Sequence, residues 1–259
     1  MTTLAPSYYA HYIEAGQSHW WFRGRARILA TIVRRFVQLP EVCVILDVGS
    51  GPGGPARGLF PQGRIIAVDL SDLALRTYEK ADSRVVADAT RVPFRPQSVT
   101  ALCAFDVLEH LDDDAEALRN WTEILAPGGW LVMTVPAYAE LWSRHDEING
   151  HRRRYRAHEL SRLLMAAGLT VERLTYFNSL LLPGVAAVRW GQRLFKKGYV
   201  PDTNTQHDES DFGLHLPGWL EHCCEWALHL EALWLRRFTL PAGVSICVVA
   251  RARGPKPAS

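Results

Sequence analysis

Three aspartates each follow a short apolar segment, and their positions suggest a shared binding site. Asp47 lies in the run CVILDV, Asp69 ends RIIAVD, and Asp88 follows RVVA. If these runs are neighbouring parallel strands, their carboxyl ends meet at the edge where open α/β sheets bind ligands. Acids placed there can bind ribose hydroxyls, and we expect Asp88 to accept a hydrogen bond from an adenine amino group. The three carboxylates together favour a nucleoside that carries positive charge.

A glycine-rich turn follows the first of these segments. Gly49, Gly51 and Gly53 alternate in DVGSGPGG, and glycine lets the backbone bend sharply and approach a ligand without a Cβ clash. Gly49, Gly51 and Gly54 also satisfy the G-x-G-x-x-G pattern of dinucleotide-binding proteins. The carboxylate of Asp47, two residues before the first glycine, would repel a pyrophosphate. We therefore favour a cationic ligand and keep an NAD(P)-dependent oxidoreductase as the alternative.

Candidate acid–base groups lie in the run CAFDVLEHLDDD, at the end of the fourth apolar segment. The run contains Asp106, Glu109 and His110. His110 is the leading candidate for a general base, because an unperturbed imidazole has a pKa of about 6.5. The alternative is that Glu109 and His110 only open a helix, whose dipole favours an acid at its start. We predict that His110 and the adjacent Glu109 are catalytic.

A basic stretch, NGHRRRYRAHEL at residues 149–160, contains Arg152, Arg153, Arg154 and Arg156. Arginine can hold a phosphate or carboxylate through two parallel hydrogen bonds. Two interpretations stay open: the arginines bind an anionic ligand, or they pair with internal acids such as those of the preceding HDEING.

The apolar segments that position these groups alternate with helical patterns, which is typical of a parallel, doubly wound α/β sheet. Residues 21–37 and 157–167 have apolar side chains at helical spacing. The strand segments are 43–48, 64–69, 84–87, 99–105, 129–135, 169–177 and 243–250.

About 65 residues separate the last two predicted strands, far more than an ordinary loop. A helix is expected at about 219–235 with one apolar face, formed by Leu220, Cys223, Ala227, Leu230 and Trp234. We interpret this insertion as a helical lid over a cleft; contact with a membrane surface is the alternative. The predicted parts are a helical cap at 1–40, a binding core at 41–177, the lid at 178–242, the last core strand at 243–252 and a disordered tail at 253–259.

The totals limit the class of partner. The chain has 259 residues, 48% of them hydrophobic, and a formal net charge of only +2. A nucleic-acid-binding face would raise that charge further, so we expect no nucleic acid. No run is long enough to cross a membrane, the start does not read as a signal peptide, and the five cysteines form no C-x-x-C pair. We therefore expect a cytoplasmic protein with at most peripheral membrane contact.

The run of motifs resembles class I S-adenosylmethionine-dependent methyltransferases over about residues 20–177. DVGSGPG, AVDLS, ADATRVPF, FDVLEHL and LAPGGWLVMTVP occur in the order of that family. HWWFRGRARIL and HDEINGHRRRYR are similar to a bacterial subgroup of small-molecule methyltransferases with HWWF and HRRRYR motifs. The resemblance implies a Rossmann-like seven-stranded sheet with an antiparallel last strand. It also implies the cofactor S-adenosylmethionine, which leaves as S-adenosylhomocysteine.

The resemblance assigns roles to residues. It implies donor binding by Asp47, Gly49, Gly51, Gly53, Asp69, Leu70, Asp88, Ala89 and the backbone near Phe105. In HWWFRGR, we expect Trp20, Trp21 or Phe22 to pack on the sulfonium and Arg25 to clamp the donor's carboxylate. The alternative is that the tryptophans anchor a helix to the core. Loops after the fourth and fifth strands face the acceptor in this family. The expected acceptor contacts are therefore His145, Asp146, His151, Arg152, Arg153 and Tyr155.

The function expected from these patterns is methylation of a small, anionic and partly lipophilic acceptor, such as a natural-product, prenyl or glycan-pathway intermediate. The other candidates are the oxidoreductase, a catalytically inactive partner subunit with the methyltransferase fold, and an RNA methyltransferase. We predict no metal site. His207, Asp208, Glu209, Asp211 and His215, or His222 with His229, match no known ligand spacing.

Overall fold

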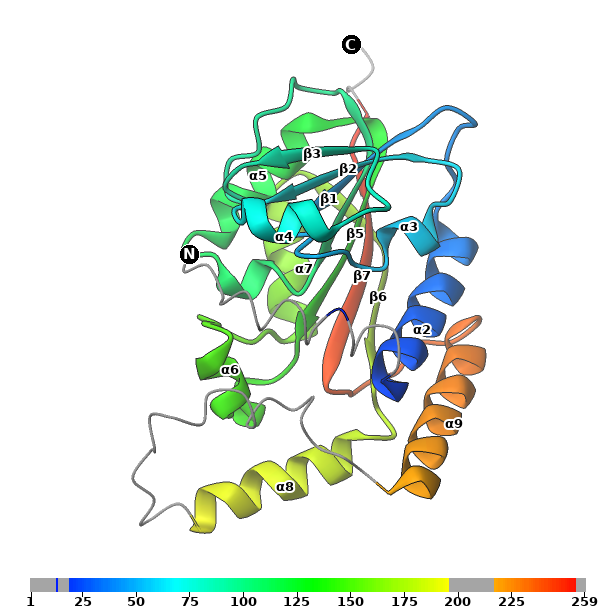
Figure 1. The fold of residues 1–259 in the computed structure, drawn as a ribbon, viewed down its shortest axis with the longest axis vertical. Coiled ribbons are helices and arrows are strands. Elements are labelled where there is room, and N and C mark those ends of the chain that lie inside the picture. The colour runs from blue at the N-terminus through cyan, green and yellow to red at the C-terminus, as the bar shows by residue number, and fades with distance from the viewer. Residues whose placement is uncertain (1–12, 14–18, 196–216, 255–259) are drawn as a thin grey trace.

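The core of the protein is one seven-stranded sheet (Figure 1). The computed structural model describes residue 13, residues 19–195 and residues 217–254. The strands are β1 (Val44–Val48), β2 (Arg64–Asp69), β3 (Ser83–Val86), β4 (Val99–Phe105), β5 (Leu125–Pro136), β6 (Leu169–Phe177) and β7 (Ser245–Ala252). Their order is β3-β2-β1-β4-β5-β7-β6, with β1 to β5 parallel and β7 antiparallel to both of its neighbours. The predicted Rossmann-like sheet with an antiparallel last strand is confirmed.

Helices cover both faces of the sheet. The helices of the described residues are α2 (Trp20–Phe36), α3 (Ala56–Leu59), α4 (Asp72–Thr77), the 3₁₀ helix η1 (Leu108–His110), α5 (Asp114–Ile124), the 3₁₀ helix η2 (Ala139–Leu141), α6 (Arg144–Ile148), α7 (Ala157–Ala166), α8 (Leu182–Phe195) and α9 (Gly218–Leu235). Side chains of a strand alternate between faces. In β1, Leu46 and Val48 therefore join the core under α5 and α7, whereas Ile45 joins the core under α2 and α9.

Helix α2 begins at a capped end and packs closely on α9. The imidazole of His19 accepts a hydrogen bond from the backbone N–H of Trp21 at 3.2 Å, which satisfies one exposed donor of the first turn. Figure 1 shows α2 and α9 side by side. A Cβ atom built at Gly24 would lie 2.3 Å from Cδ1 of Leu228, so glycine is required for this close approach.

The apolar face predicted for α9 is not the face that the structure buries. Cys223, Leu230 and Trp234 are exposed, and the side chains that enter the core are those of Leu228, Ala232 and Leu235. Apolar residues occur all round this helix, so the sequence period did not distinguish the buried face from the exposed one. Helix α9 therefore forms part of the layer that covers the sheet.

Helix α8 lies below α6 in Figure 1, with α9 to its right. The guanidinium of Arg189 donates a hydrogen bond to the carbonyl of Leu141 in η2, which ties α8 to the segment after β5. Within the described ranges, none of the helices combines the length and apolar content that crossing a bilayer requires. The rest of the insertion, residues 196–216, lies outside the described residues.

Candidate active site

The predicted donor residues gather at the carboxyl ends of β1, β2 and β3. Asp47 lies near the end of β1 with 1% of its surface exposed, and Asp69 is the last residue of β2. The strand register pairs Asp47 with Ala67, and Asp69 with Val86 at the end of β3. The first crossover starts beside β4, where the strand order reverses, which is the usual ligand position in an open α/β sheet.

The glycine turn after β1 has the backbone conformation that the motif predicts. Gly49, Gly51 and Gly53 all have positive φ, at 62°, 54° and 121°. A Cβ atom at Gly49 would lie 2.5 Å from Cγ2 of Val107, whereas one at Gly51 would meet no atom within 4 Å. Gly49 is therefore needed by the protein's own packing, whereas Gly51 borders open space.

Asp47 is a buried carboxylate in need of a positive partner. Its Oδ2 atom has no hydrogen-bond partner among the described residues. Burial raises the pKa of Asp47 to about 7, and the nearby carboxylate of Asp69 adds to the rise. A cationic group bound beside Asp47 would favour its charged form and lower that pKa. This property fits the ammonium of a methionine-like donor.

Asp69 and Asp88 also hold their own loops in place. The two carboxylate oxygens of Asp69 accept hydrogen bonds from the backbone N–H groups of Gly51 at 2.8 Å and Ser71 at 2.9 Å. Asp88 accepts one from the N–H of Thr90 at 2.7 Å. Each oxygen can accept a further bond. The acids thus stabilise the turns and still offer acceptors to a ligand. Leu70 directly follows β2.

Ala89, predicted to contact adenine, lies in the core with 5% of its surface exposed. Its carbonyl accepts a hydrogen bond from the indole N–H of Trp121 in α5 at 2.8 Å. This bond fixes the segment after β3 against the helix that follows η1. The sequence contained no sign of this contact, because 32 residues separate its two partners.

Arg25 reaches from α2 to the ends of β4 and β5. Its Nη2 atom lies 2.5 Å from Oδ2 of Asp106 and donates a hydrogen bond to Oγ1 of Thr134 at 2.7 Å. Thr134 in turn donates to Oδ1 of Asp106 at 2.9 Å. The guanidinium stacks 5.0 Å from the ring centre of Trp21. The predicted pair Trp21 and Arg25 is therefore brought together at the donor side.

This triad leaves one donor available. The Nε atom of Arg25 is buried and has no hydrogen-bond partner among the described residues. A carboxylate of a ligand is one group that would satisfy it. Asp106, which follows Phe105, has φ of 57°, a strained conformation for a residue with a side chain. Sequence reasoning missed Thr134; its only signal was a single hydroxyl in the apolar strand β5.

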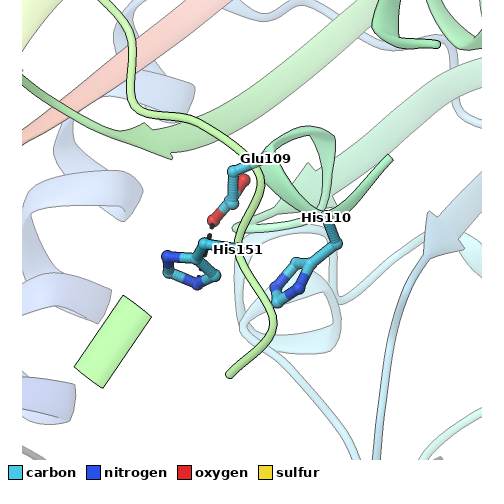
Figure 2. Close-up of side chains that lie close together, drawn as sticks. All are labelled: Glu109, His110 and His151. Carbon is cyan, nitrogen blue, oxygen red and sulfur yellow. Dashed lines mark ion pairs between the residues drawn. The ribbon is translucent and has the colours of Figure 1, made fainter. Parts of the chain in front are cut away.

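The predicted catalytic pair lies in η1, directly after β4, and His151 approaches it from the loop after α6 (Figure 2). Glu109 is completely buried, and neither of its carboxylate oxygens has a hydrogen-bond partner among the described residues. Burial raises its pKa well above the usual range, and Asp106 adds to the rise. The rings of His110 and His151 meet edge to face, with centroids 4.7 Å apart.

His110 is held in its neutral form at neutral pH. Burial lowers its pKa to about 4, and the neighbouring His151 ring lowers it further than burial alone would. A neutral imidazole can accept a proton, but so low a pKa makes it a weak base. The geometry therefore allows the predicted role and does not select it.

The buried part of the basic stretch is an internal network around Asp146. Arg154 donates to both oxygens of Asp146, through Nε at 2.7 Å and Nη2 at 3.0 Å. His151 Nδ1 lies 2.8 Å from the same carboxylate, and the N–H of Ser143 donates to it at 2.8 Å. Although burial opposes ionisation, the bonds from His151 and Arg154 hold the pKa of Asp146 well below its usual range. Asp146, predicted to touch the acceptor, instead organises this loop.

The other arginines of the stretch also have acidic partners. Arg152 lies 3.2 Å from Asp112, Arg153 lies 3.0 Å from Asp114, and Arg156 pairs with Glu140. The internal salt-bridge interpretation therefore accounts for every arginine in this motif. Arg152 differs in being loosely held, because 54% of its side chain and 84% of that of Asp112 are exposed.

Tyr155 has only 3% of its surface exposed, and its hydroxyl donates to Asp114 at 2.9 Å. This geometry supports a structural role in place of the predicted acceptor contact. The ring of His145 lies 6.0 Å from that of His151, at the edge of the same cluster. His222, by contrast, is an exposed residue whose ring bonds to the carbonyl of Gly218 within its own helix. The polar loop containing His207 to His215 lies outside the described residues.

Comparisons with known proteins agree with the assignment of a donor site at the ends of β1, β2 and β3. Residues 46–133 match the family model described as a methyltransferase domain. That range runs from β1 to β5 and contains the glycine turn and the three aspartates. The match of this range to a methyltransferase domain agrees with the predicted methyltransferase class.

Two curated relatives match longer stretches. An uncharacterised 37.1 kDa protein in transposon TN4556 of Streptomyces fradiae is 26% identical over 205 residues, covering 68% of this chain and 56% of the relative. A protein of Mycobacterium tuberculosis, named a probable S-adenosylmethionine-dependent methyltransferase, is 29% identical over 156 residues, covering 58% of this chain and 56% of the relative. The chain thus spans just over half the length of these relatives.

Solved structures share the fold across most of the chain. One chain of the Haloferax volcanii complex containing the Trm112 methyltransferase activator has a TM-score of 0.60 and 18% identity, covering 97% of each chain. Geranyl diphosphate C-methyltransferase from Streptomyces coelicolor, solved with Mg²⁺, geranyl diphosphate and S-adenosyl-L-homocysteine, has a TM-score of 0.54 and 14% identity. That match covers 86% of this chain and 78% of the other. At such identities the likeness concerns the fold.

Proposed function

We propose that this protein is an S-adenosylmethionine-dependent methyltransferase that methylates a small acceptor molecule. Two observations carry the proposal: Oδ2 of the buried Asp47 has no hydrogen-bond partner among the described residues, and the same turn has open space at Gly51. A pyrophosphate beside that carboxylate would be repelled, whereas an ammonium would be attracted. The matched methyltransferase domain over residues 46–133 supports the same reading.

The residues divide the work of holding the donor. Asp47 attracts the ammonium, Asp69 binds the ribose hydroxyls, and Asp88 accepts from the adenine amino group. Arg25 offers its buried Nε to the carboxylate, while Asp106 and Thr134 keep the guanidinium in place. The bound donor supplies an electrophilic methyl group on a sulfonium. The protein's task is to align an acceptor in line with the C–S bond and to exclude water.

The acceptor side consists of Glu109, His110, His151 and the loop that contains Arg152. We assign proton removal to His110, because its neutral ring lies at the end of β4, next to the donor site. Arg152 is the arginine most able to bind an anion, since its exposed pair with Asp112 can exchange partners at little cost. The other arginines of the HRRRYR motif support the loop.

An acceptor with a lipophilic part fits the insertion. Helix α8 is tied to η2 through Arg189, and it exposes Val188 and Trp190 at 54% and 56%. Apolar side chains near an acceptor loop would cover a prenyl or similar group. The structural neighbour geranyl diphosphate C-methyltransferase is named after a compound that has both an anionic end and an apolar chain. We place the chain with the small-molecule subgroup on these grounds.

Thermal unfolding tests the donor assignment. S-Adenosylhomocysteine at about 100 times its Kd should stabilise the wild-type chain by about 2.7 kcal/mol, and NAD should have no effect. Asp47→Asn should lose most of the stabilisation by S-adenosylhomocysteine. Stabilisation by NAD without any response to S-adenosylhomocysteine would favour the oxidoreductase instead.

Methyl transfer to paired compounds tests the acceptor assignment. Prenyl diphosphates and the corresponding prenyl alcohols differ only in the anionic group. If the acceptor is anionic, the diphosphates should react preferentially, and Arg152→Ala should raise KM about tenfold or more. Arg156→Ala is the matched control, because Arg156 is also an exposed arginine of the motif that pairs with an exposed acid, Glu140. Equal KM values for the two variants would remove the role of Arg152.

A further inference from the structure

Three potential metal ligands converge on the acceptor side of the site. Glu109 and His110 extend from η1, and His151 comes from the loop before α7 (Figure 2). One ligand atom from each residue can be chosen so that all three lie within 4.8 Å of one another. Nε2 of His151 is 3.9 Å from Oε1 of Glu109. Within the described ranges, this is the one group of three or more such residues that is close enough to share an ion.

Glu109 lacks the partners that a buried carboxyl group needs. It is 0% exposed, and both of its oxygens are without a hydrogen bond among the described residues. Buried polar groups are normally hydrogen-bonded, and buried charges are normally paired or coordinate metals. Arg25, the basic group at the donor side, is already held by Asp106 and Thr134. A bound cation would satisfy both oxygens of Glu109.

His151 is oriented as metal-ligating histidines are. The ionised carboxylate of Asp146 can only accept a hydrogen bond, so Nδ1 of His151 must be the donor. The lone pair then belongs to Nε2, which is the nitrogen near Glu109. A carboxylate that holds the second nitrogen of a ligating histidine is a recurring feature of metal sites. Arg154 fixes that carboxylate with two further bonds.

We propose that Glu109, His110 and His151 bind a divalent first-row transition-metal ion such as Zn²⁺. Two imidazoles with one carboxylate suit such ions better than Mg²⁺, which prefers oxygen ligands. Two ligands of a tetrahedral ion, each about 2.1 Å from it, lie about 3.4 Å apart. The ligand atoms of this cluster lie within 4.8 Å of one another, so they would move closer by up to about 1.4 Å when the ion binds. Three protein ligands leave a position open for a further oxygen atom.

The open coordination position of the ion allows a role in catalysis, which rests on the proposed function. An acceptor hydroxyl or enol bound there would lose its proton more readily, because the cation stabilises the oxyanion. A histidine nitrogen that ligates the ion has no lone pair for proton removal, so His110 acts as a ligand while the ion is bound. The proton of the bound hydroxyl then passes to solvent water, and the ion stabilises the oxyanion that remains. Proton removal by His110 applies to the metal-free protein.

Titration of the metal-free, untagged full chain tests the site without donor or acceptor. Co²⁺ should produce the visible absorption of a low-symmetry site that contains nitrogen, and Zn²⁺ should displace it one for one. Glu109→Gln and His151→Asn should each weaken binding by at least about 10–100-fold, the range seen on loss of metal-site interactions. His158→Gln is the matched control, since 62% of that side chain is exposed on α7. It should bind Co²⁺ like the wild type.

Two results would overturn the site. One is that the wild type shows no saturable Co²⁺ binding. The other is that Glu109→Gln and His151→Asn bind Co²⁺ with the same affinity as His158→Gln. If Glu109→Gln or His151→Asn does not fold, His110→Gln replaces it, because His110 is partly exposed. The Co²⁺ spectrum of the wild type tests the site even without any variant. Stabilisation by S-adenosylhomocysteine, measured on the same metal-free protein, reports separately on the proposed methyltransferase. Loss of one property therefore leaves the other measurable.

Discussion

The donor half and the acceptor half of the site are built in different ways. Asp47, Asp69 and the glycine turn all lie at a strand end or within a few residues of it, and backbone N–H groups of the neighbouring turns hold Asp69. On the acceptor side, contacts join residues far apart in sequence, such as His151 with Glu109. The first half is a local motif on a rigid sheet, and the second is a network whose members depend on one another.

This difference explains what each half tolerates. A local motif loses ligand affinity when one group is changed, but the sheet below it keeps its shape. A buried network loses stability when one member is removed, because the remaining charges stay buried without partners. The donor half is therefore expected to respond mainly in binding, and the acceptor loop mainly in folding.

The largest expected effect is on the buried pair of Asp146 and Arg154. Asp146→Asn leaves Arg154 without its carboxylate, and loss of one partner of a buried pair costs about 3–5 kcal/mol. The matched control is Asp112→Asn, whose exposed pair with Arg152 should contribute about 0–1 kcal/mol. Free energies of unfolding from urea denaturation measure both. Similar losses for the two variants would contradict the division between buried and exposed arginines.

The pH dependence of stability gives the next largest effect. The folded-state pKa of Asp47 is about 7, compared with an ordinary value of 3.8. Between these values the folded chain holds a proton on Asp47 that the unfolded chain has released, so the contribution of Asp47 to the stability of the donor-free protein falls as pH rises from about 4 to about 7. One pKa unit corresponds to about 1.4 kcal/mol, and the loss should reach a few kcal/mol.

Asp47→Asn removes this contribution. The free energy of unfolding of the variant, relative to that of the wild type, should therefore increase as pH rises over the same interval. Asp112→Asn, with 84% of its side chain exposed, should run parallel to the wild type. Urea denaturation at pH 4.5, 6 and 8 supplies the comparison. A constant difference between Asp47→Asn and wild type would show that Asp47 is already ionised in the folded chain.

The smallest effect compares two glycines with similar backbones. Gly51 has φ of 54° and Gly150 has φ of 68°, and a Cβ atom at either position would meet nothing within 4 Å. Alanine should therefore cost about 1 kcal/mol of stability at both sites, because the left-handed conformation disfavours a side chain. Only Gly51→Ala should weaken S-adenosylhomocysteine binding, by about tenfold or more in calorimetry. Equal affinities would remove Gly51 from the donor site.

Most of the fold could be predicted because its signals are local. Continuous apolar runs placed every strand within a few residues, and the family order of motifs implied the reversed last strand. Strand β5 starts at Leu125, earlier than the predicted 129, because Leu125 pairs with Val99 before the register shifts. The sequence pattern marked only the segment beyond the Gly128–Gly129 turn, where the pairing is regular.

The site was predictable to the extent that one motif carries it. The aspartates and glycines of the donor half followed from their own short segments. The partners of Arg25 did not, because Asp106 and Thr134 are distant in sequence and meet it only when α2 crosses the strand ends. The arginine-rich stretch was equally ambiguous, since the same residues can bind a ligand or pair with Asp146. Only the fold distinguishes Arg154, which is buried, from Arg152, which is exposed.

A crystal structure of the chain grown with S-adenosylhomocysteine would decide whether this site binds the donor. We expect the amino acid part of the ligand beside Asp47 and Arg25, with the ribose on Asp69. We expect the adenine next to Asp88, and atoms of the ligand in the open space beside Gly51. Density for a dinucleotide with its phosphates on the glycine turn, or an S-adenosylhomocysteine bound elsewhere, would contradict this expectation.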